Sequence, residues 1–175
     1  MTTDSGTVAT PFDYGAGQVN PTGALDPGLV YDLAADDYLH FLCNYGYDAT
    51  KIKLITSPPA GFSCAANASK DLISDLNYPS IAVTGLGAVA SRTVTREVTN
   101  VGAQEDATYA VAVSAPAGLD VKVVPTKLQF SSTVKKLAFQ VTFSRDNTTA
   151  KGALTGSITW SDGKHTVHSP FAISN

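Results

Sequence analysis

The chain has 175 residues, of which 43% are hydrophobic and 15% charged, and its formal net charge is −3. The length is that of one domain with a smaller addition, and the hydrophobic share is sufficient for a packed core. The basic residues cluster no further than the pair Lys135-Lys136, which argues against nucleic acid or an anionic membrane as a partner, and no apolar run approaches the ~20 residues of a membrane span.

The first part of the chain, residues 1–33, is rich in glycine and has little hydrophobic periodicity. Pro11, Pro21 and Pro27 restrict the backbone, so no long helix is expected. A segment of this kind rarely folds alone and is expected to lie against a larger body. The chain as given shows no charged stretch followed by an apolar core at its start, so no secretory signal is expected in it.

Residues 33–55 are expected to be helical, with Asp32 as the N-cap of the first helix. Gly46 is expected to end this helix, and Asp48 to cap a second, shorter one. Residues 56–76 are expected to form a loop. The apolar stripe of the first helix follows i, i+3, i+4 spacing and consists of Leu39, Leu42 and Cys43.

From Tyr78 onward the hydrophobic period changes to two, which is typical of half-buried strands. The sharpest turn sequence is Asp162-Gly163, which predicts a type I′ hairpin turn. About seven short strands over roughly 100 residues predict a mainly β fold, an antiparallel β-sandwich of immunoglobulin or fibronectin type III kind. The absence of a Cys–Trp–Cys spacing disfavours a true immunoglobulin domain. Alternating aromatic residues are expected in the core, among them Phe139, Phe143 and Trp160.

One short stretch, Asp4-Ser5-Gly6-Thr7, has the spelling of an aspartic-protease active site. That site needs two carboxylates that share a proton, held on turns between apolar strands. Only three residues precede Asp4, which is too few for such a strand. The stretch is therefore expected to be a polar linker.

The three histidines offer little catalytic potential. A Ser-His-Asp hydrolase needs a nucleophile on a sharp turn, and no Gly-x-Ser-x-Gly occurs. His40 follows Asp36 by four residues, a spacing that on a helix more often gives a surface salt bridge. His165 and His168 are three apart on an expected strand, so they point to opposite faces, and no zinc-ligand spacing is present. The residues thus predict no catalytic residue, metal or cofactor, and leave a binding or structural role.

Two cysteines and two glycosylation sequons bear on the compartment. The stretch between Cys43 and Cys64 is loop-like, and the residues alone leave open whether the two cysteines form a disulfide or remain reduced. The sequons at Asn67 and Asn147 fit a secreted glycoprotein, which favours the disulfide, although such triplets also arise by chance.

Several runs of sequence resemble the plant subtilisin-like serine proteases, the subtilases. Thr10–Leu33 is similar to the end of their catalytic domain, and Asp36–Tyr47 to the helix that follows it. Leu76–Val83, Arg96–Gly102 and Ile158–Pro170 resemble the C-terminal fibronectin type III-like domain of that family. Together these runs occur in order and are spread along essentially the whole chain.

The resemblance implies three parts. Residues 1–33 are expected to be the remnant of the end of a subtilisin-like catalytic domain, 34–76 two short helices with a disulfide loop, and 77–175 the fibronectin type III-like sandwich. It places Met1-Thr2-Thr3 downstream of the catalytic triad, so no catalytic residue carries over and no enzyme activity is expected. It also implies that the two cysteines form a disulfide.

In the family, the intact enzyme is a secreted endopeptidase, often of the cell wall or apoplast, and its C-terminal domain supports the folding, stability and activity of the catalytic domain. The chain is therefore expected to be a secreted, non-catalytic accessory region whose partner is that catalytic domain. Without the partner, apolar side chains should be exposed or fold back loosely on the sandwich, and exposed apolar surface should favour association, including a homodimer. Those side chains are Tyr14, Val19, Leu25, Leu29 and Val30.

The alternative is a free-standing extracellular β-sandwich that binds a protein or a cell-wall glycan. Such a module needs an exposed aromatic cluster, for which the sequence offers Tyr45, Tyr47 and Phe62. Nothing in these residues singles out a ligand.

Overall fold

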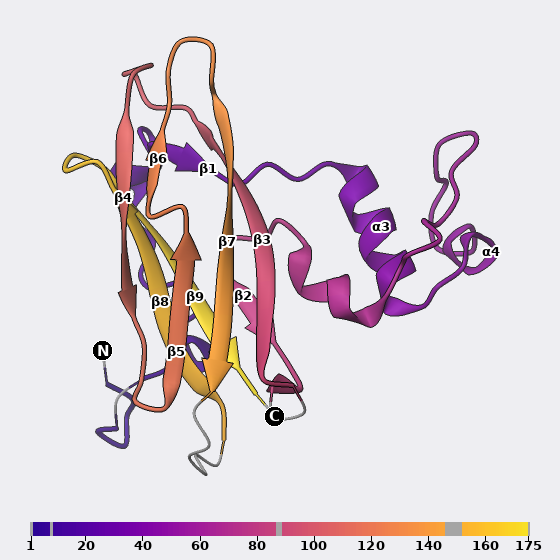
Figure 1. The fold of residues 1–175 in the computed structure, drawn as a ribbon, viewed down its shortest axis with the longest axis horizontal. Coiled ribbons are helices and arrows are strands. Elements are labelled where there is room, and N and C mark those ends of the chain that lie inside the picture. The colour runs from indigo at the N-terminus through magenta and orange to yellow at the C-terminus, as the bar shows by residue number, and fades with distance from the viewer. Residues whose placement is uncertain (1, 8, 87–88, 146–151, 175) are drawn as a thin grey trace.

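The computed structural model describes residues 2–7, 9–86, 89–145 and 152–174. Within these residues nine strands form two sheets, ordered β1–β3–β7–β5 and β2–β9–β8–β4–β6 (Figure 1). The strands are β1 (Leu29–Val30), β2 (Ile81–Val83), β3 (Ser91–Asn100), β4 (Thr108–Ser114), β5 (Leu119–Val124), β6 (Lys127–Gln129), β7 (Lys136–Arg145), β8 (Leu154–Ser161) and β9 (Thr166–Ile173).

The predicted mainly β sandwich is confirmed, and its core is built on the alternating strands. The inward side chains of β7 meet those of β8 and β9 from the opposite sheet. Phe139 packs edge-on against Trp160, and Phe143 against Phe171, each pair with ring centroids 5.2 Å apart. All four rings are buried. Edge-to-face pairs of this kind stabilise the join between the sheets beyond the burial of their area.

Two short strands were not predicted, and one of them departs from the antiparallel arrangement. β2 pairs in parallel with β9, and β1 adds an antiparallel edge to β3 through the pairs Leu29↔Asn100 and Val30↔Thr99. Val30 is partly buried, and Leu29 is only 3% exposed, so the expectation that Leu29 is exposed or folded back loosely is wrong. Its side chain belongs to the sandwich core, and its backbone completes a sheet edge.

The helices are short, and most of them lie outside the sandwich. They are α1 (Pro11–Tyr14), α2 (Pro21–Ala24), α3 (Ala35–Tyr45), α4 (Ala49–Ile52) and the 3-10 helix η1 (Lys70–Asp75). Pro11 and Pro21 each begin a one-turn helix, because proline suits the first helical position even though it prevents a longer helix. In Figure 1, α3, α4 and η1 project to one side of the sandwich as an arm, here defined as residues 34–76.

The ends of the arm helices follow the sequence with one exception. Gly46 ends α3 in the left-handed conformation, and the Asp48 carboxylate caps α4 by accepting from the Lys51 backbone N–H at 2.8 Å. The predicted cap Asp32 is wrong, since α3 begins after Ala34. There the Asp37 carboxylate accepts from the Ala34 backbone N–H at 2.7 Å. Within the predicted loop 56–76, η1 adds a helical turn.

The hairpin between β8 and β9 differs from the predicted type I′ turn. Ser161 pairs with Thr166, so four residues connect the strands. A type I′ turn would need positive φ at both Asp162 and Gly163. Only Gly163 has it, and the Asp162 carboxylate instead accepts from the backbone N–H groups of Lys164 and His165. This Asx geometry directs the His165 side chain toward the sandwich.

Candidate functional site: an exposed apolar segment and its anchors

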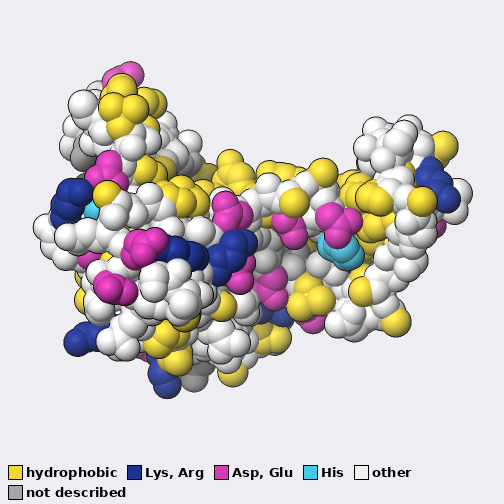
Figure 2. Space-filling view, turned by 90° about the horizontal axis from the view of Figure 1, so that it is seen from above, with side chains coloured by type: hydrophobic (Ala, Val, Ile, Leu, Met, Phe, Trp, Pro, Cys, Tyr) yellow, Lys and Arg dark blue, Asp and Glu magenta, His cyan; other side chains and the backbone are white. Residues whose placement is uncertain are grey.

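Several strongly exposed apolar side chains belong to residues 9–27, which we term the docking segment. Phe12 is 73% exposed, Leu25 87% and Val19 90%, and Tyr14 is also exposed. Figure 2 shows hydrophobic side chains on a knob that projects from the sandwich. Exposed apolar side chains gathered on one short segment are typical of an interaction site. For Tyr14, Val19 and Leu25 the expected exposure is therefore observed.

A groove runs between the docking segment and the edge where β2 meets β9. It encloses about 440 Å³ and is lined mainly by apolar groups, among them Phe12, Tyr78, Ile81 and Pro170. An apolar groove beside exposed aromatic rings can receive an apolar side chain from another surface.

The docking segment is joined to the sandwich through Gly28. The Gly28 carbonyl accepts from the backbone N–H groups of Val101 at 2.9 Å and Gly102 at 3.2 Å. A Cβ at this position would lie 2.6 Å from Tyr109 Oη and 2.8 Å from the His165 ring, and the φ of +76° is unfavourable for any other residue. Only glycine therefore lets the chain approach the sandwich this closely.

A charged cluster next to Gly28 holds the end of the docking segment. His165 Nδ1 lies 2.8 Å from Asp162 Oδ2, and His165 Nε2 lies 3.1 Å from Asp26 Oδ2. Lys164 Nζ lies 2.8 Å from the same Asp26 oxygen. The His165 side chain is only 9% exposed, whereas Asp26 reaches solvent. Two segments 138 residues apart in sequence are thus joined by opposite charges.

The environment of this cluster shifts its ionisation. The hydrogen bond to Asp162 and the ion pair with Asp26 raise the pKa of His165 above its ordinary value, despite burial. Burial opposes ionisation of Asp162, but hydrogen bonds from the His165 side chain and from backbone N–H groups lower its pKa to about 2. Both shifts favour a charged imidazolium next to ionised carboxylates.

A buried guanidinium attaches the chain after η1 to the sandwich. Arg96 of β3 is 3% exposed and donates to the backbone carbonyls of Tyr78 at 2.9 Å and Ser74 at 2.7 Å. It also donates to the carbonyls of Thr95 and Ser80. Burial lowers the pKa of Arg96, but these carbonyl acceptors stabilise its charge. The arm is therefore tied to the rigid part of the fold.

Asn77 closes the base of the arm. Its amide group donates to the carbonyls of Asp32 at 3.1 Å and Glu97 at 2.9 Å, and its oxygen accepts from the Glu97 backbone N–H at 2.8 Å. One side chain thus connects the chain entering the arm, the chain leaving it and strand β3.

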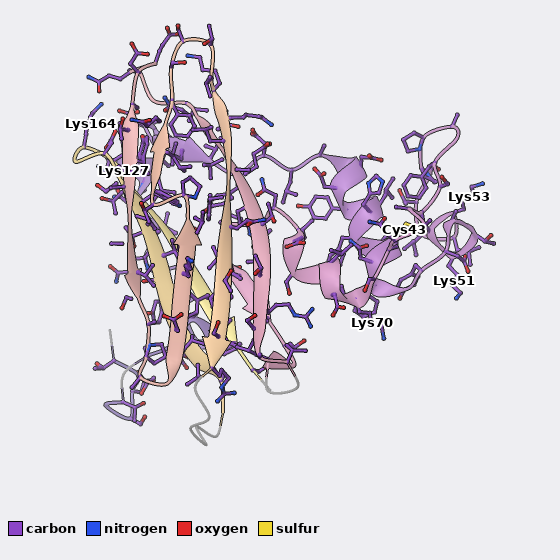
Figure 3. The ribbon with its side chains drawn as sticks, viewed as in Figure 1. Cys43, Lys51, Lys53, Lys70, Lys127 and Lys164 are labelled. Atoms are coloured by element: carbon purple, nitrogen blue, oxygen red, sulfur yellow. A yellow bond between two sulfur atoms is a disulfide. The ribbon has the colours of Figure 1, made fainter. Side chains whose placement is uncertain are left out.

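The arm has its own small core and a disulfide. Cys43 of α3 and Cys64 are bonded, and beside them Leu39 and Ile52 are buried. Figure 3 shows Cys43 facing the loop that follows α4. Asn67 is exposed on a turn of that loop, whereas Asn147 lies outside the described residues.

The aromatic residues of the arm divide between surface and core. Tyr45 and Tyr47 are exposed and stack with ring centroids 6.0 Å apart. Phe62 instead packs against the arm core and lies edge-on to His40. The stacked pair, together with Tyr38 of α3, thus provides exposed aromatic surface on the arm.

The other candidate residues form no reaction centre. His40 Nδ1 lies 3.4 Å from Asp36 Oδ2 with both side chains exposed, as expected of a surface pair. The hydroxyl groups of Thr3, Ser5 and Thr7 bond to one another in an exposed turn. Among the described residues no group of His, Cys, Asp or Glu could hold a metal ion, and no helix is both long and apolar enough to cross a membrane.

Sequence reasoning missed Arg96 and the pairing of Asp26 with His165. A signal for Arg96 exists in the sequence. It lies two residues from both Val94 and Val98 on one strand, so its side chain must share their inward face. Nothing in the local sequence pairs Asp26 with His165, since that contact depends on the path of the whole chain.

Comparison with known proteins identifies the chain. Residues 75–173 match the family described as fibronectin type-III domain. The chain is 46% identical over 176 residues to the CO(2)-response secreted protease of Arabidopsis thaliana, which covers 100% of this chain and 23% of that protein. It is 43% identical over 180 residues to subtilisin-like protease SBT5.1 of Arabidopsis thaliana, again covering 100% and 23%.

The chain therefore spans about a quarter of the length of these relatives. Among solved structures, half of the chain (50%) is similar to 81% of a FixG-related protein from Vibrio parahaemolyticus, with 14% identity and a TM-score of 0.41. The predicted resemblance is confirmed by the family match and by these relatives: the chain belongs to the fibronectin type-III domain family and is the C-terminal region of subtilisin-like proteases that carries this domain.

Proposed function

We propose that this chain is a non-catalytic accessory region that supports the folding, stability and activity of a subtilisin-like catalytic domain. The observation that carries the proposal is the docking segment, whose apolar side chains Phe12, Val19 and Leu25 are exposed although the chain around Gly28 is firmly fixed. Burying these side chains against a partner would remove apolar area from water, worth roughly 1.5–3 kcal/mol for each one fully buried.

The division of the chain supports the same proposal. The sandwich behind the docking segment is densely packed and presents it at one edge, beside an apolar groove. A rigid body that presents an exposed apolar segment suits the role of a support for another domain better than that of a catalyst.

A chimera tests the proposal. In the CO(2)-response secreted protease of Arabidopsis thaliana, the region matched by this chain is replaced by the chain itself, and secretion and proteolytic activity are measured. We expect an active, secreted chimera. The triple variant Phe12→Ser, Val19→Ser and Leu25→Ser should lower the amount of active enzyme, because the docking surface becomes polar.

A matched control separates docking from general loss of apolar surface. Val113 of β4 and Val124 of β5 are also exposed apolar side chains, but they belong to strands of the sandwich and not to the docking segment. The double variant Val113→Ser and Val124→Ser should leave secretion and activity unchanged. Equal activity in the docking triple variant and the unmodified chimera would contradict the proposal.

A second candidate function rests on the stacked pair Tyr45–Tyr47. Exposed aromatic faces on a secreted module can hold a glycan, so the arm would bind a cell-wall polysaccharide. Binding of the isolated chain to immobilised wall polysaccharides, compared with the variant Tyr45→Ser and Tyr47→Ser, tests this. Retention that does not depend on the two tyrosines would remove the candidate.

We further propose that the chain acts outside the cell, in the apoplast or cell wall, and carries a glycan on Asn67. One relative is named as a secreted protease, and Asn67 is exposed on a turn. Expression through a plant secretory pathway should add a glycan that Asn67→Gln removes, read by intact-protein mass spectrometry. A variant that keeps the full glycan mass of the unmodified chain would contradict glycosylation at Asn67.

A further inference from the structure

The contact between the docking segment and the β8–β9 turn contains more acceptors than a neutral imidazole can satisfy. His165 has a carboxylate at each ring nitrogen, Asp162 at Nδ1 and Asp26 at Nε2. A neutral imidazole carries one N–H, and a charged imidazolium carries two. Nδ1 and Asp162 form a hydrogen bond, whereas the Nε2–Asp26 contact at 3.1 Å is an ion pair without hydrogen-bond geometry, so it depends on the positive charge of the protonated ring.

The two carboxylates are held unequally. Asp162 also accepts from the backbone N–H groups of His165 at 2.6 Å and Lys164 at 2.9 Å, so it stays in place whatever the charge of the ring. Asp26 has no such backbone bond among the described contacts and relies on His165 and Lys164. When the ring loses a proton, the remaining N–H stays with Asp162. The neutral ring then has no charge with which to attract the Asp26 carboxylate across the Nε2 contact.

We propose that Asp26, His165 and Asp162 form a proton-operated latch, which holds residues 20–26 of the docking segment against the sandwich in mildly acidic solution and loosens them at higher pH. The latch lies beside the fixed chain around Gly28, so the hinge is already defined. It deepens the proposed function as a regulation of docking, but its test measures the docking segment itself. Its failure would leave the docking proposal untouched.

The direction of the pH dependence follows from the groups that face the His165 ring. Asp26, Asp162, Lys164 and Tyr109 are the titratable neighbours, and burial beside the two carboxylates raises the pKa of Tyr109, which stays neutral. Because the folded-state pKa of His165 is raised, its contribution is fully present below about pH 6.5, the ordinary histidine value. The contribution is lost as the pH rises through the folded-state value.

Hydrogen exchange of the full chain at pH 5.5 and pH 8 tests the latch, after correction for intrinsic exchange rates. The Ala24 and Leu25 amides, bonded to the carbonyls of Asn20 and Thr22, report on residues 20–26. We expect opening about five-fold faster at pH 8, in line with the loss of one ion pair. Equal protection at the two pH values would overturn the proposal.

Three variants assign the effect. His165→Gln and Asp26→Asn should each abolish the pH dependence, whereas Lys164→Gln should speed exchange at both pH values and keep their ratio. Loss of the ratio in Lys164→Gln, or its retention in His165→Gln, would overturn the latch. Should His165→Gln fold poorly, the exposed change Asp26→Asn still decides, because NMR titration of the His165 ring must then give a lower pKa than in the unmodified chain. An unchanged pKa would also overturn it.

Discussion

Reduction of the Cys43–Cys64 disulfide should loosen the arm while leaving the sandwich folded. The two cysteines are 21 residues apart, and in the chain-entropy model a loop of that length stabilises the closed form by about 3 kcal/mol. Since 1.4 kcal/mol corresponds to a factor of ten, the open fraction of the arm should rise about 100-fold. The sandwich has a separate and much larger core, so it should not follow.

Hydrogen exchange with mass spectrometry on the oxidised and reduced chain measures this directly. Peptides from α3 should exchange about 100-fold faster after reduction, and peptides from β7 should be unchanged. The double variant Cys43→Ala and Cys64→Ala, measured without reductant, should match the reduced chain and exclude an effect of the reagent. The reasoning is refuted if β7 accelerates together with α3, or if α3 does not change.

The remaining predictions concern single side chains. Arg96→Leu should destabilise the chain by about 3 kcal/mol in urea unfolding, because buried carbonyls lose a charged donor; a change below about 1 kcal/mol would contradict the role of Arg96 as an anchor. Phe139→Ala should cost about 3–5 kcal/mol, whereas Phe12→Ala should change stability by less than about 0.5 kcal/mol; similar losses would contradict the assignment of core and surface. Because the pKa of Asp162 is about 2, its carboxylate should contribute stability above about pH 4 that disappears as the pH falls toward 2. Thermal unfolding of Asp162→Asn should lack that acid-side decline.

The sandwich could be predicted because its long strands repeat with a strict period. Along β7, Phe139, Val141 and Phe143 alternate with polar residues, and all three are buried. Leu29 was expected to be exposed or loosely packed because the family resemblance assigns it to the end of a catalytic domain, and a two-residue strand has no period that would indicate otherwise. Its burial is decided by β3, which offers an unpaired edge.

The candidate site was less predictable than the fold. The exposure of Val19 and Leu25 could be inferred from the family resemblance, because it implies that these side chains normally pack against a catalytic domain. The latch could not, because Asp26 and His165 meet only after both sheets have formed. Asp162-Gly163 also has the spelling of a common hairpin turn, which concealed the Asx geometry that directs His165 inward.

The three hydrogen bonds of the Asn77 side chain bear on how the sequence of the arm can vary. They bring the chain entering the arm and the chain leaving it onto one side chain, within 3.1 Å of the Asp32 carbonyl. The arm is an insertion with adjacent ends, so the length and sequence of its outer part, α3, α4 and the disulfide loop, can be altered without moving the strands, provided that the Ser74 carbonyl keeps its bond to Arg96. The outer part of an arm from another member of the family could be grafted in its place, and the sandwich should still fold with the Asp32–Asn77 contact intact.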